Sequence, residues 1–331
     1  MTQPSLDVVA IGNAIIDVIA NCEDAKIEEL GLARGGMTLI DADQARSLYA
    51  AMGPAREISG GSAANTLAGL AALGVKCGFI GQVAQDQLGE VFTHDIRAGG
   101  IRFDVPARPG EPPTARCLIF VTPDGQRTMN TFLGASQHLP AEALDEALIA
   151  DAAVLYLEGY LWDPEEPRAA MRKAIAAARR AGRKVAFTPS ETFVIDRYRA
   201  DFLEMIDAGE IDLLFCNEHE MAALTGAEDF EAGIAALAPK VPVLVVTRSA
   251  EGAVAIAEGA RAEVAAEPVE RVVDTTGAGD LFAAGFLSGH VRGMPLADCL
   301  RLGAICASEI ISHYGARAEQ DLKAFVAARM G

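Results

Sequence analysis

The chain has 331 residues, of which 51% are hydrophobic, and a formal net charge of −18 at pH 7. The length and hydrophobic content allow one large α/β domain with an appendage. The negative charge argues against nucleic acids and anionic membranes as partners, because both attract basic patches.

Cysteine usage and the N-terminal segment indicate a reducing compartment. The six cysteines contain no CxxC pair, which is typical of reduced, buried thiols and not of disulfides or a zinc site. The first ten residues lack a basic segment followed by an apolar run, and no stretch of about 18 apolar residues occurs. We therefore expect a cytoplasmic protein without a signal peptide or a membrane span.

The first predicted strand, residues 6–11, ends at a glycine and is followed by two polar side chains, Asn13 and Asp17. A ligand crevice commonly opens at the carboxyl end of such a strand. An amide and a carboxylate at this position suit the vicinal hydroxyls of a sugar. A turn role for Asn13 and a solvated Asp17 are the simpler explanation when this pattern is taken alone.

A helix is predicted at 43–52, and the run GGSAAN at 60–65 begins a second, alanine-rich helix. Two glycines leave the start of this helix bare, and Asn65 lies one turn beyond Gly61. A hydroxyl-bearing substrate could therefore contact the Gly61 N–H and the Asn65 amide together. We expect Ser62 to cap this helix. A strand at 77–83 and a helix at 86–99 follow.

Residues 105–135 predict a β-hairpin with strands at 114–122 and 127–132 joined by the turn PDGQ. With a strand near 37–40, the hairpin could form a small sheet outside the main one, and segments 13–56 and 105–135 would then build a lid. Arg127 directly follows the turn. It is either a solvated charge on a sheet edge or a group that reaches a substrate phosphate when the lid closes.

After residue 139, strands and helices alternate regularly, which predicts a parallel sheet with helices on both faces. The strands are at 154–157, 184–188, 211–216 and 242–247, and the helices are at 167–181, 202–208, 217–225 and 234–237. A hairpin at 253–257 and 261–265 and three helices at 278–292, 296–312 and 319–328 complete the chain.

The segment NEHE at 217–220 directly follows a predicted strand. Asn217 and Glu220 are spaced to share one helix face. An amide and a carboxylate at this spacing can hold a hydrated Mg²⁺ ion, which prefers oxygen ligands and keeps its waters. The alternative is a helix cap in which Glu220 completes a capping box.

The run VVDTTGAGD at 272–280 predicts a strand, a tight glycine turn and the first turn of a helix. A helix start presents unpaired N–H groups with partial positive charge, and Gly277 and Gly279 have no side chain to block an anion. The turn therefore suits a phosphate. A carboxylate at Asp280 repels phosphate unless it takes a proton from a hydroxyl that attacks phosphorus. The alternative is a solvated acid at a helix start.

This run resembles the signature of the ribokinase-like (PfkB) carbohydrate and nucleoside kinases. The resemblance covers nearly the whole chain, and GNxxxD, GGSxxN, the FLGAS segment and NExE are most similar to adenosine kinases. It implies an α/β, three-layer α/β/α fold in a single domain (1–331), with a mostly parallel sheet and a small β-sheet lid. It also implies ATP at the carboxyl edge of the sheet.

The resemblance further implies roles for individual residues. It makes Asp280 the catalytic base and Gly277, Ala278 and Gly279 the anion hole. The acceptor pocket would contain Asn13, Asp17, Gly61, Ser62 and Asn65. ATP would contact Asn217, Thr247, Arg248, Gly252, Gly277 and Gly279. Mg²⁺ would be held, through water, by Asn217 and Glu220, and K⁺ by Asp274 and Thr276. Arg248 stands where many relatives have glycine, which puts the nucleotide contacts there in doubt.

The implied reaction is ATP-dependent phosphorylation of the 5′-hydroxyl of adenosine to AMP in purine salvage. An apolar slot from Cys117, Leu133 and Tyr160 would favour a nucleoside, whereas a more polar pocket would favour a ribose or fructose kinase. Whether Tyr160, Leu161 or Trp162 contacts the base stays open. A silent binding protein is disfavoured by Asp280 and its glycine turn. Exposed lid edges allow either a monomer or a lid-mediated homodimer.

Overall fold

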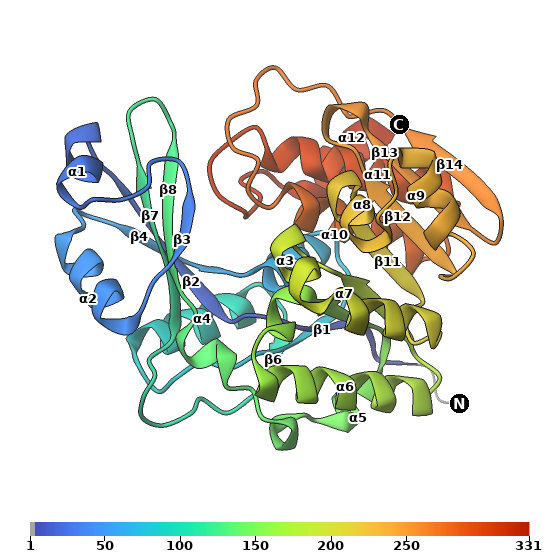
Figure 1. Cartoon of the computed structure of the whole chain (residues 1–331), viewed down its shortest axis with the longest axis horizontal. Coiled ribbons are helices and arrows are strands. Elements are labelled where there is room, and N and C mark those ends of the chain that lie inside the picture. The colour runs from blue at the N-terminus through green and yellow to red at the C-terminus, as the bar shows by residue number, and fades with distance from the viewer. Residues whose placement is uncertain (1–3, 331) are drawn as a thin grey trace.

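The computed structural model describes residues 4–330, which form two β-sheets and the helices around them (Figure 1). The larger sheet has nine strands within these residues. From edge to edge they are β14 (Ala260–Val264), β13 (Ala253–Ala257), β12 (Val243–Thr247), β11 (Leu213–Asn217), β10 (Lys184–Thr188), β9 (Ala152–Glu158), β1 (Leu6–Ile11), β5 (Cys77–Ile80) and β6 (Arg102–Phe103).

The sheet is parallel from β12 to β6, and β13 alone among its strands is reversed, pairing antiparallel with both β12 and β14. Its central strand β1 is buried on both faces: Val8 and Ala10 pack on one side, and Val9 and Ile11 pack on the other. A strand that is apolar at successive positions requires helices on both sides. The predicted three-layer α/β/α arrangement with a mostly parallel sheet is confirmed.

Two groups of helices cover the two faces of the large sheet. On one face lie α3 (Ser62–Ala72), α4 (Gln87–Ala98), α10 (Ala278–His290), α11 (Leu296–Ile310) and α12 (Leu322–Met330). On the other lie α5 (Glu146–Ala150), α6 (Glu165–Arg180), α7 (Thr192–Asp207), α8 (Glu218–Thr225) and α9 (Phe230–Leu237). Short 3₁₀ turns are η1 (Gly134–Gln137), η2 (Ala141–Ala143), η3 (Gly159–Trp162) and η4 (Ser249–Glu251). Among the described helices, none is long and apolar enough to cross a membrane.

The smaller sheet lies at one end of the molecule, at the left of Figure 1. Its strand order is β3 (Met37–Leu39), β8 (Arg127–Phe132), β7 (Ala115–Val121), β2 (Ile15–Asn21) and β4 (Arg56–Gly60). The predicted hairpin and the strand near residue 37 are confirmed. The sequence reading missed β2 and β4, which add two strands to this sheet.

The missed strand β2 positions a candidate acid. It begins only a few residues after β1, so the chain passes directly from the large sheet into the small one. Its residues alternate between two environments: Ile16 and Val18 are fully buried, on the side where α1 (Asp24–Glu29) and α2 (Ala42–Ala51) contribute Ile27 and Leu48. The opposite side chains of the strand include Asp17.

The strand expected at Val272 and Val273, before the glycine turn, is wrong. Residues 265–276 contain no strand, and the Val273 N–H donates instead to the Ile311 carbonyl at 2.8 Å. The hairpin β13–β14 already extends the sheet beyond β12, and Val272 is left 53% exposed. Two β-branched residues were too short a run to identify a strand.

Candidate active site

A cavity of about 660 Å³ lies where the small sheet meets the carboxyl ends of the large-sheet strands. Asp17 on β2 and Asp280 on α10 both line it, although 263 positions separate them (280 − 17). Other predicted site residues also line it: Gly61, Ser62, Asn65, Cys117, Tyr160, Asn217, Glu220, Thr247, Thr276, Gly277, Ala278 and Gly279. The fold therefore brings the two acids to one cavity.

Asp280 is held by two side chains from the first turn of α3. Ser62 Oγ donates to Asp280 Oδ1 at 2.6 Å, and Asn65 Nδ2 donates to Oδ2 at 3.0 Å. Burial raises the pKa of Asp280, while these two hydrogen bonds and the charge of Arg317 act against the rise. The alternative of a solvated acid at a helix start does not describe this residue.

The expectation that Ser62 caps α3 is wrong. The N-cap is Gly61, and no side chain of the cap residue binds the helix start. Gly61 has a φ of 98°, and a Cβ there would lie 2.2 Å from the Asn13 carbonyl oxygen. Glycine is therefore required for steric reasons at this position, and the Ser62 hydroxyl serves Asp280 instead.

Asp17 has a pKa raised to about 6, because burial disfavours its charged form. The positive charges of Arg127 and Arg317 act against this rise, and the negative charge of Asp280 adds to it. The two acids are thus electrostatically coupled. A carboxylate in this position can accept hydrogen bonds from two neighbouring hydroxyls.

The glycine turn before α10 has the geometry of an anion site. Gly277 is the N-cap with a φ of 78°, and a Cβ there would lie 2.7 Å from the Ala316 Cβ. The Ala278 N–H donates to the Thr275 carbonyl at 3.2 Å. A Cβ added at Gly279 would meet nothing within 4 Å, so the backbone there is open to an approaching group.

A second cavity of about 610 Å³ adjoins the first at this turn. Both cavities are lined by Asn217, Thr247, Thr275, Ala278, Gly279 and Phe282. The second one also has Gly252 and an apolar wall made by Ala266, Pro268, Val269, Val272 and Ile311. Its apolar wall and its contact with the glycine turn suit a nucleotide whose phosphates point toward Asp280.

Comparisons with known proteins agree with this geometry. The model of the pfkB family of carbohydrate kinases matches residues 5–322. The chain belongs to this family. It is therefore a phosphotransferase with an alcohol acceptor, because pfkB-family kinases act on hydroxyl groups of sugars or nucleosides.

Similar solved structures span nearly the whole length of this pfkB-family chain. An adenosine kinase from Sinorhizobium meliloti is 48% identical, covers 98% of this chain and 99% of its own, and has a TM-score of 0.89. A probable sugar kinase from Rhizobium etli CFN 42 is 44% identical, with 99% of both chains covered and a TM-score of 0.90. A curated fructokinase from Klebsiella pneumoniae is 29% identical over 78% of this chain and 87% of its own.

Asn217 and Glu220 form the capping box that was the alternative to a metal site. Asn217 Oδ1 accepts from the Glu220 N–H at 2.8 Å, and the Asn217 N–H and Nδ2 donate to Glu220 at 3.0 and 2.8 Å. Burial raises the pKa of Glu220 to about 7. Both residues line the 660 Å³ cavity that contains Asp17 and Asp280, called the acceptor cavity from here on. Their oxygens suit Mg²⁺ bound through water. Within the described residues, no three His, Cys, Asp or Glu side chains form a metal cluster.

The carboxylate of Asp274 is already filled by protein groups. It accepts from the Thr276 N–H (3.0 Å), Thr276 Oγ1 (2.7 Å) and the Gly315 N–H (3.0 Å), and it pairs with Arg127 Nη1. Although burial acts to raise the pKa of Asp274, these partners hold it below its usual value. A carboxylate so occupied does not fit K⁺. The solvated-edge alternative for Arg127 is wrong, because its side chain is only 7% exposed.

Some predicted site residues lie outside both cavities. The Arg248 guanidinium stacks 4.1 Å from the Phe230 ring and pairs with Glu251. Asn13 lies behind the cavity wall, where Glu158 and Ser136 bind it. Leu133, Leu161 and Trp162 do not line the acceptor cavity, so Tyr160 is the aromatic of its segment that does.

Several residues of the site were missed by sequence reasoning. Arg317 lies in an irregular loop between α11 and α12 and belongs to no motif. Glu158 is fully buried at the end of β9 and accepts from the N–H groups of Asn13 and Ala63, both at 2.7 Å. An acid that ends an apolar strand was a readable signal for Glu158. Glu191 also lines the cavity, and no local pattern marked it.

Proposed function

We propose that this pfkB-family kinase transfers the γ-phosphoryl group of ATP to the 5′-hydroxyl of adenosine, giving AMP and ADP, in cytoplasmic purine salvage. The observation that carries the proposal is the shared cavity, with Asp17 at one side, Asp280 at another and the glycine turn beside Asp280. The similarity to an adenosine kinase at 48% identity supports this choice of acceptor.

Asp17 binds the acceptor in this proposal. Its carboxylate accepts hydrogen bonds from the 2′- and 3′-hydroxyls of ribose, which are vicinal and point the same way. Gly61 and Asn65 also line this side of the pocket, and Asn65 Oδ1 is buried without a hydrogen-bond partner among the described residues. The ribose is then oriented with its 5′-hydroxyl toward Asp280.

Asp280 takes the proton of the 5′-hydroxyl as that oxygen attacks the γ-phosphorus. The O5′–P bond forms, the bond from γ-phosphorus to the β,γ-bridging oxygen breaks, and ADP leaves. The open backbone at Gly279, at the positive end of the α10 dipole, stabilises the charge on the transferred group. Mg²⁺, held through water near Asn217 and Glu220, supplies positive charge to the ATP phosphates when bound.

The cavity wall supports a nucleoside acceptor. Ile15, Cys117, Met129, Tyr160 and Phe215 give it an apolar side that a purine ring can cover. The alternative acceptor is a free sugar such as fructose or ribose. Thr131, Thr188, Ser190 and Glu191 on the same cavity, together with the fructokinase relative, support that alternative.

The small sheet acts as a lid over the acceptor in this proposal. Its strands β2, β7 and β8 contribute Asp17, Cys117 and Met129 to the cavity. Outward movement of this sheet would admit the acceptor, and its return would exclude water from the reacting groups. Arg127 on β8 is paired with Asp274, so it would have to leave that pair to approach the phosphates of bound ATP.

The test is ATP consumption by the purified protein with adenosine, ribose and fructose as acceptors. We expect adenosine to give the highest kcat/KM and AMP to be the product identified by mass spectrometry. A higher kcat/KM for fructose or ribose would overturn the adenosine assignment in favour of a sugar kinase. ATP hydrolysis without an acceptor, measured in parallel, controls for background turnover.

A further inference from the structure

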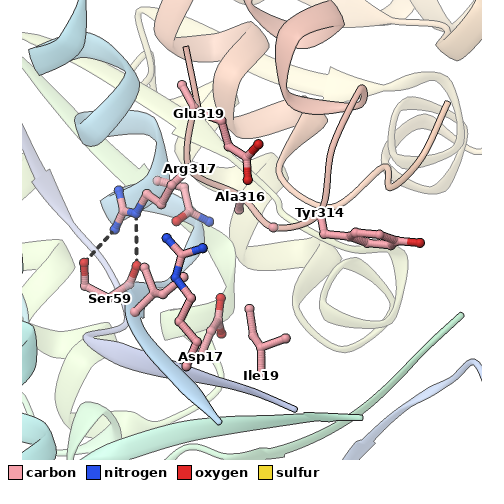
Figure 2. A pocket seen from close by; sticks show the side chains of 12 residues that line it. Asp17, Ile19, Ser59, Tyr314, Ala316, Arg317 and Glu319 are labelled. Carbon is pink, nitrogen blue, oxygen red and sulfur yellow. Dashed lines mark hydrogen bonds between the residues drawn. The ribbon is translucent and has the colours of Figure 1, made fainter. Parts of the chain in front are cut away.

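Arg317 enters the site from a loop that no catalytic motif includes. It lies between α11 and α12, and it lines a cavity of about 420 Å³ together with Asp17 and Asn65. Those two residues also line the acceptor cavity, so the two cavities adjoin at them. Figure 2 shows the Arg317 guanidinium above Ser59, up and to the left of Asp17, with its hydrogen bonds to Ser59 drawn as dashed lines.

The hydrogen bonds of Arg317 fix the start of α3. Its Nε donates to the Ser59 carbonyl at 3.0 Å, Nη1 to the Ala64 carbonyl at 2.8 Å, and Nη2 to Ser59 Oγ at 3.2 Å. Ala64 lies between Ser62 and Asn65, the two side chains that hold Asp280. One guanidinium therefore joins the end of β4 to the helix turn that orients the base.

The charge of Arg317 is placed among acids. Burial lowers the pKa of Arg317 to about 10, and the negative charges of Asp17 and Asp280 act against that fall. Its positive charge correspondingly lowers the pKa of both acids. Ionising two carboxylates in one partly buried site costs free energy, and a nearby cation lowers that cost.

Other charged and titratable groups also act on these acids. Arg127 lowers the pKa of Asp17, but it is paired with Asp274, whose negative charge acts in the opposite direction. The remaining groups coupled to Asp280 are Glu158, Tyr156 and Tyr160. None of these three supplies a positive charge. Arg56 and Glu319 line the same cavity as Asp17 and Arg317 but act on neither acid, and Asp95 acts on Arg317. Arg317 is thus the cation among these groups that acts on both Asp17 and Asp280.

We propose that Arg317 is a positioning residue for the acid pair, which fixes the α3 turn that orients Asp280 and keeps Asp17 and Asp280 ionised at the same time. The proposal rests on the proposed function in one respect, because it assigns Asp280 the work of a base. A base must be ionised before it can take a proton, so Arg317 sets the lowest pH at which the enzyme works.

The test separates the charge of Arg317 from its hydrogen bonds. Arg317→Gln removes the charge and keeps a donor, and Arg317→Lys keeps the charge and loses the planar fork. Arg292→Gln is the matched control, because Arg292 Nη2 donates to the Leu73 carbonyl at the other end of α3 (2.7 Å) and Arg292 acts on neither acid.

In R317Q we expect the acidic limb of the pH profile of kcat/KM to move to higher pH. Between pH 8 and pH 6, R317Q should lose several-fold more kcat/KM than the wild type, because a pKa raised by about one unit lowers the ionised fraction by at most about tenfold, and only at pH values below the pKa. R317K should have the same acidic limb of the pH profile as the wild type. R292Q should be less stable, but its acidic limb should not move. The proposal would be overturned if the acidic limb of R317Q stayed where it is in the wild type, or if the limb of R317K moved as far as that of R317Q.

A second measurement does not depend on turnover. Both acids have a raised pKa in the folded chain, so the free energy of unfolding falls as pH rises through their titration. Between pH 5 and pH 8, urea midpoints should fall more steeply in R317Q than in R292Q. Equal slopes would refute the role of Arg317, whereas a wild type inactive with every acceptor would refute only the proposed function. If R317K folds and R317Q does not, the result supports the need for a positive charge at position 317. If neither variant folds, the proposed role of the charge is refuted.

Discussion

We expect Asp274→Asn to destabilise the protein more than Arg127→Met, although both changes break the same ion pair. The pair joins strand β8 of the small sheet to the turn before α10, and its side chains are 7% and 8% exposed. The two partners differ in what remains when the other is removed. Asp274 keeps its hydrogen bonds from Thr276 and Gly315, whereas Nε and Nη2 of Arg127 already lack partners within the described residues.

The magnitude follows from this asymmetry. Removing one partner of a buried ion pair costs about 3–5 kcal/mol, because the other charge is left uncompensated. D274N leaves a buried guanidinium without its carboxylate, so we expect a loss near the upper end, about 5 kcal/mol. R127M leaves a carboxylate that three donors still bind, and hydrogen bonds to a charged group contribute about 1.5–3 kcal/mol each. We therefore expect R127M to lose about 3 kcal/mol or less.

The assay is urea unfolding followed by the fluorescence of Trp162, the single tryptophan of the chain, which is buried against Phe202 in the core. Arg261→Met is the matched control, because Arg261 forms a bidentate but exposed pair with Glu231 and should change the midpoint far less. Equal losses for D274N and R127M, or a larger loss for R127M, would refute the reasoning.

Three further outcomes follow from the site. Asp280→Asn should fold normally, keep its KM for adenosine and lose about 10²–10⁴-fold in kcat, the usual contribution of a general base; a steady-state assay beside a melting curve checks this. Tyr160→Ala should raise the KM for adenosine more than the KM for ATP, since Tyr160 lines only the acceptor cavity. Burial raises the pKa of Glu158 from 4.5 to about 7, so the folded chain binds its proton more tightly and the free energy of unfolding falls as pH rises across that window. In Glu158→Gln, the urea midpoint should therefore fall less with rising pH than it does in the wild type.

The parallel sheet and the convergence of the two acids followed from local patterns. Strand β1 is apolar at successive positions, which identifies a central strand, and its carboxyl end leads directly to Asp17. The glycine turn at Gly277 and the helix after it were readable because a left-handed backbone position leaves a sequence signal. Carboxyl ends of parallel strands meet at one edge, so segments far apart in the chain could be assigned to one site.

The contacts of the site could not be predicted in the same way, because they depend on partners far away in the chain. Arg127 was expected to be either an edge charge or a phosphate contact, and its actual partner Asp274 is 147 positions away. Arg317 bonds to Ser59 across 258 positions and has no periodic pattern around it. Local sequence gives a residue's secondary structure and its face, whereas a side chain's partner depends on how the elements pack.

The start of α3 explains why Ser62 holds the base and not its own helix. The N–H of Ala63, an orphan donor of the first turn, is satisfied by Glu158 Oε2 at 2.7 Å. The carboxyl group of Glu158 on β9 thus does the work that a capping side chain normally does. Because the cap is supplied from elsewhere, the Ser62 hydroxyl is available to Asp280 at 2.6 Å. Glu158→Gln should therefore lower kcat as well as stability, because it loosens the turn that carries Ser62 and Asn65.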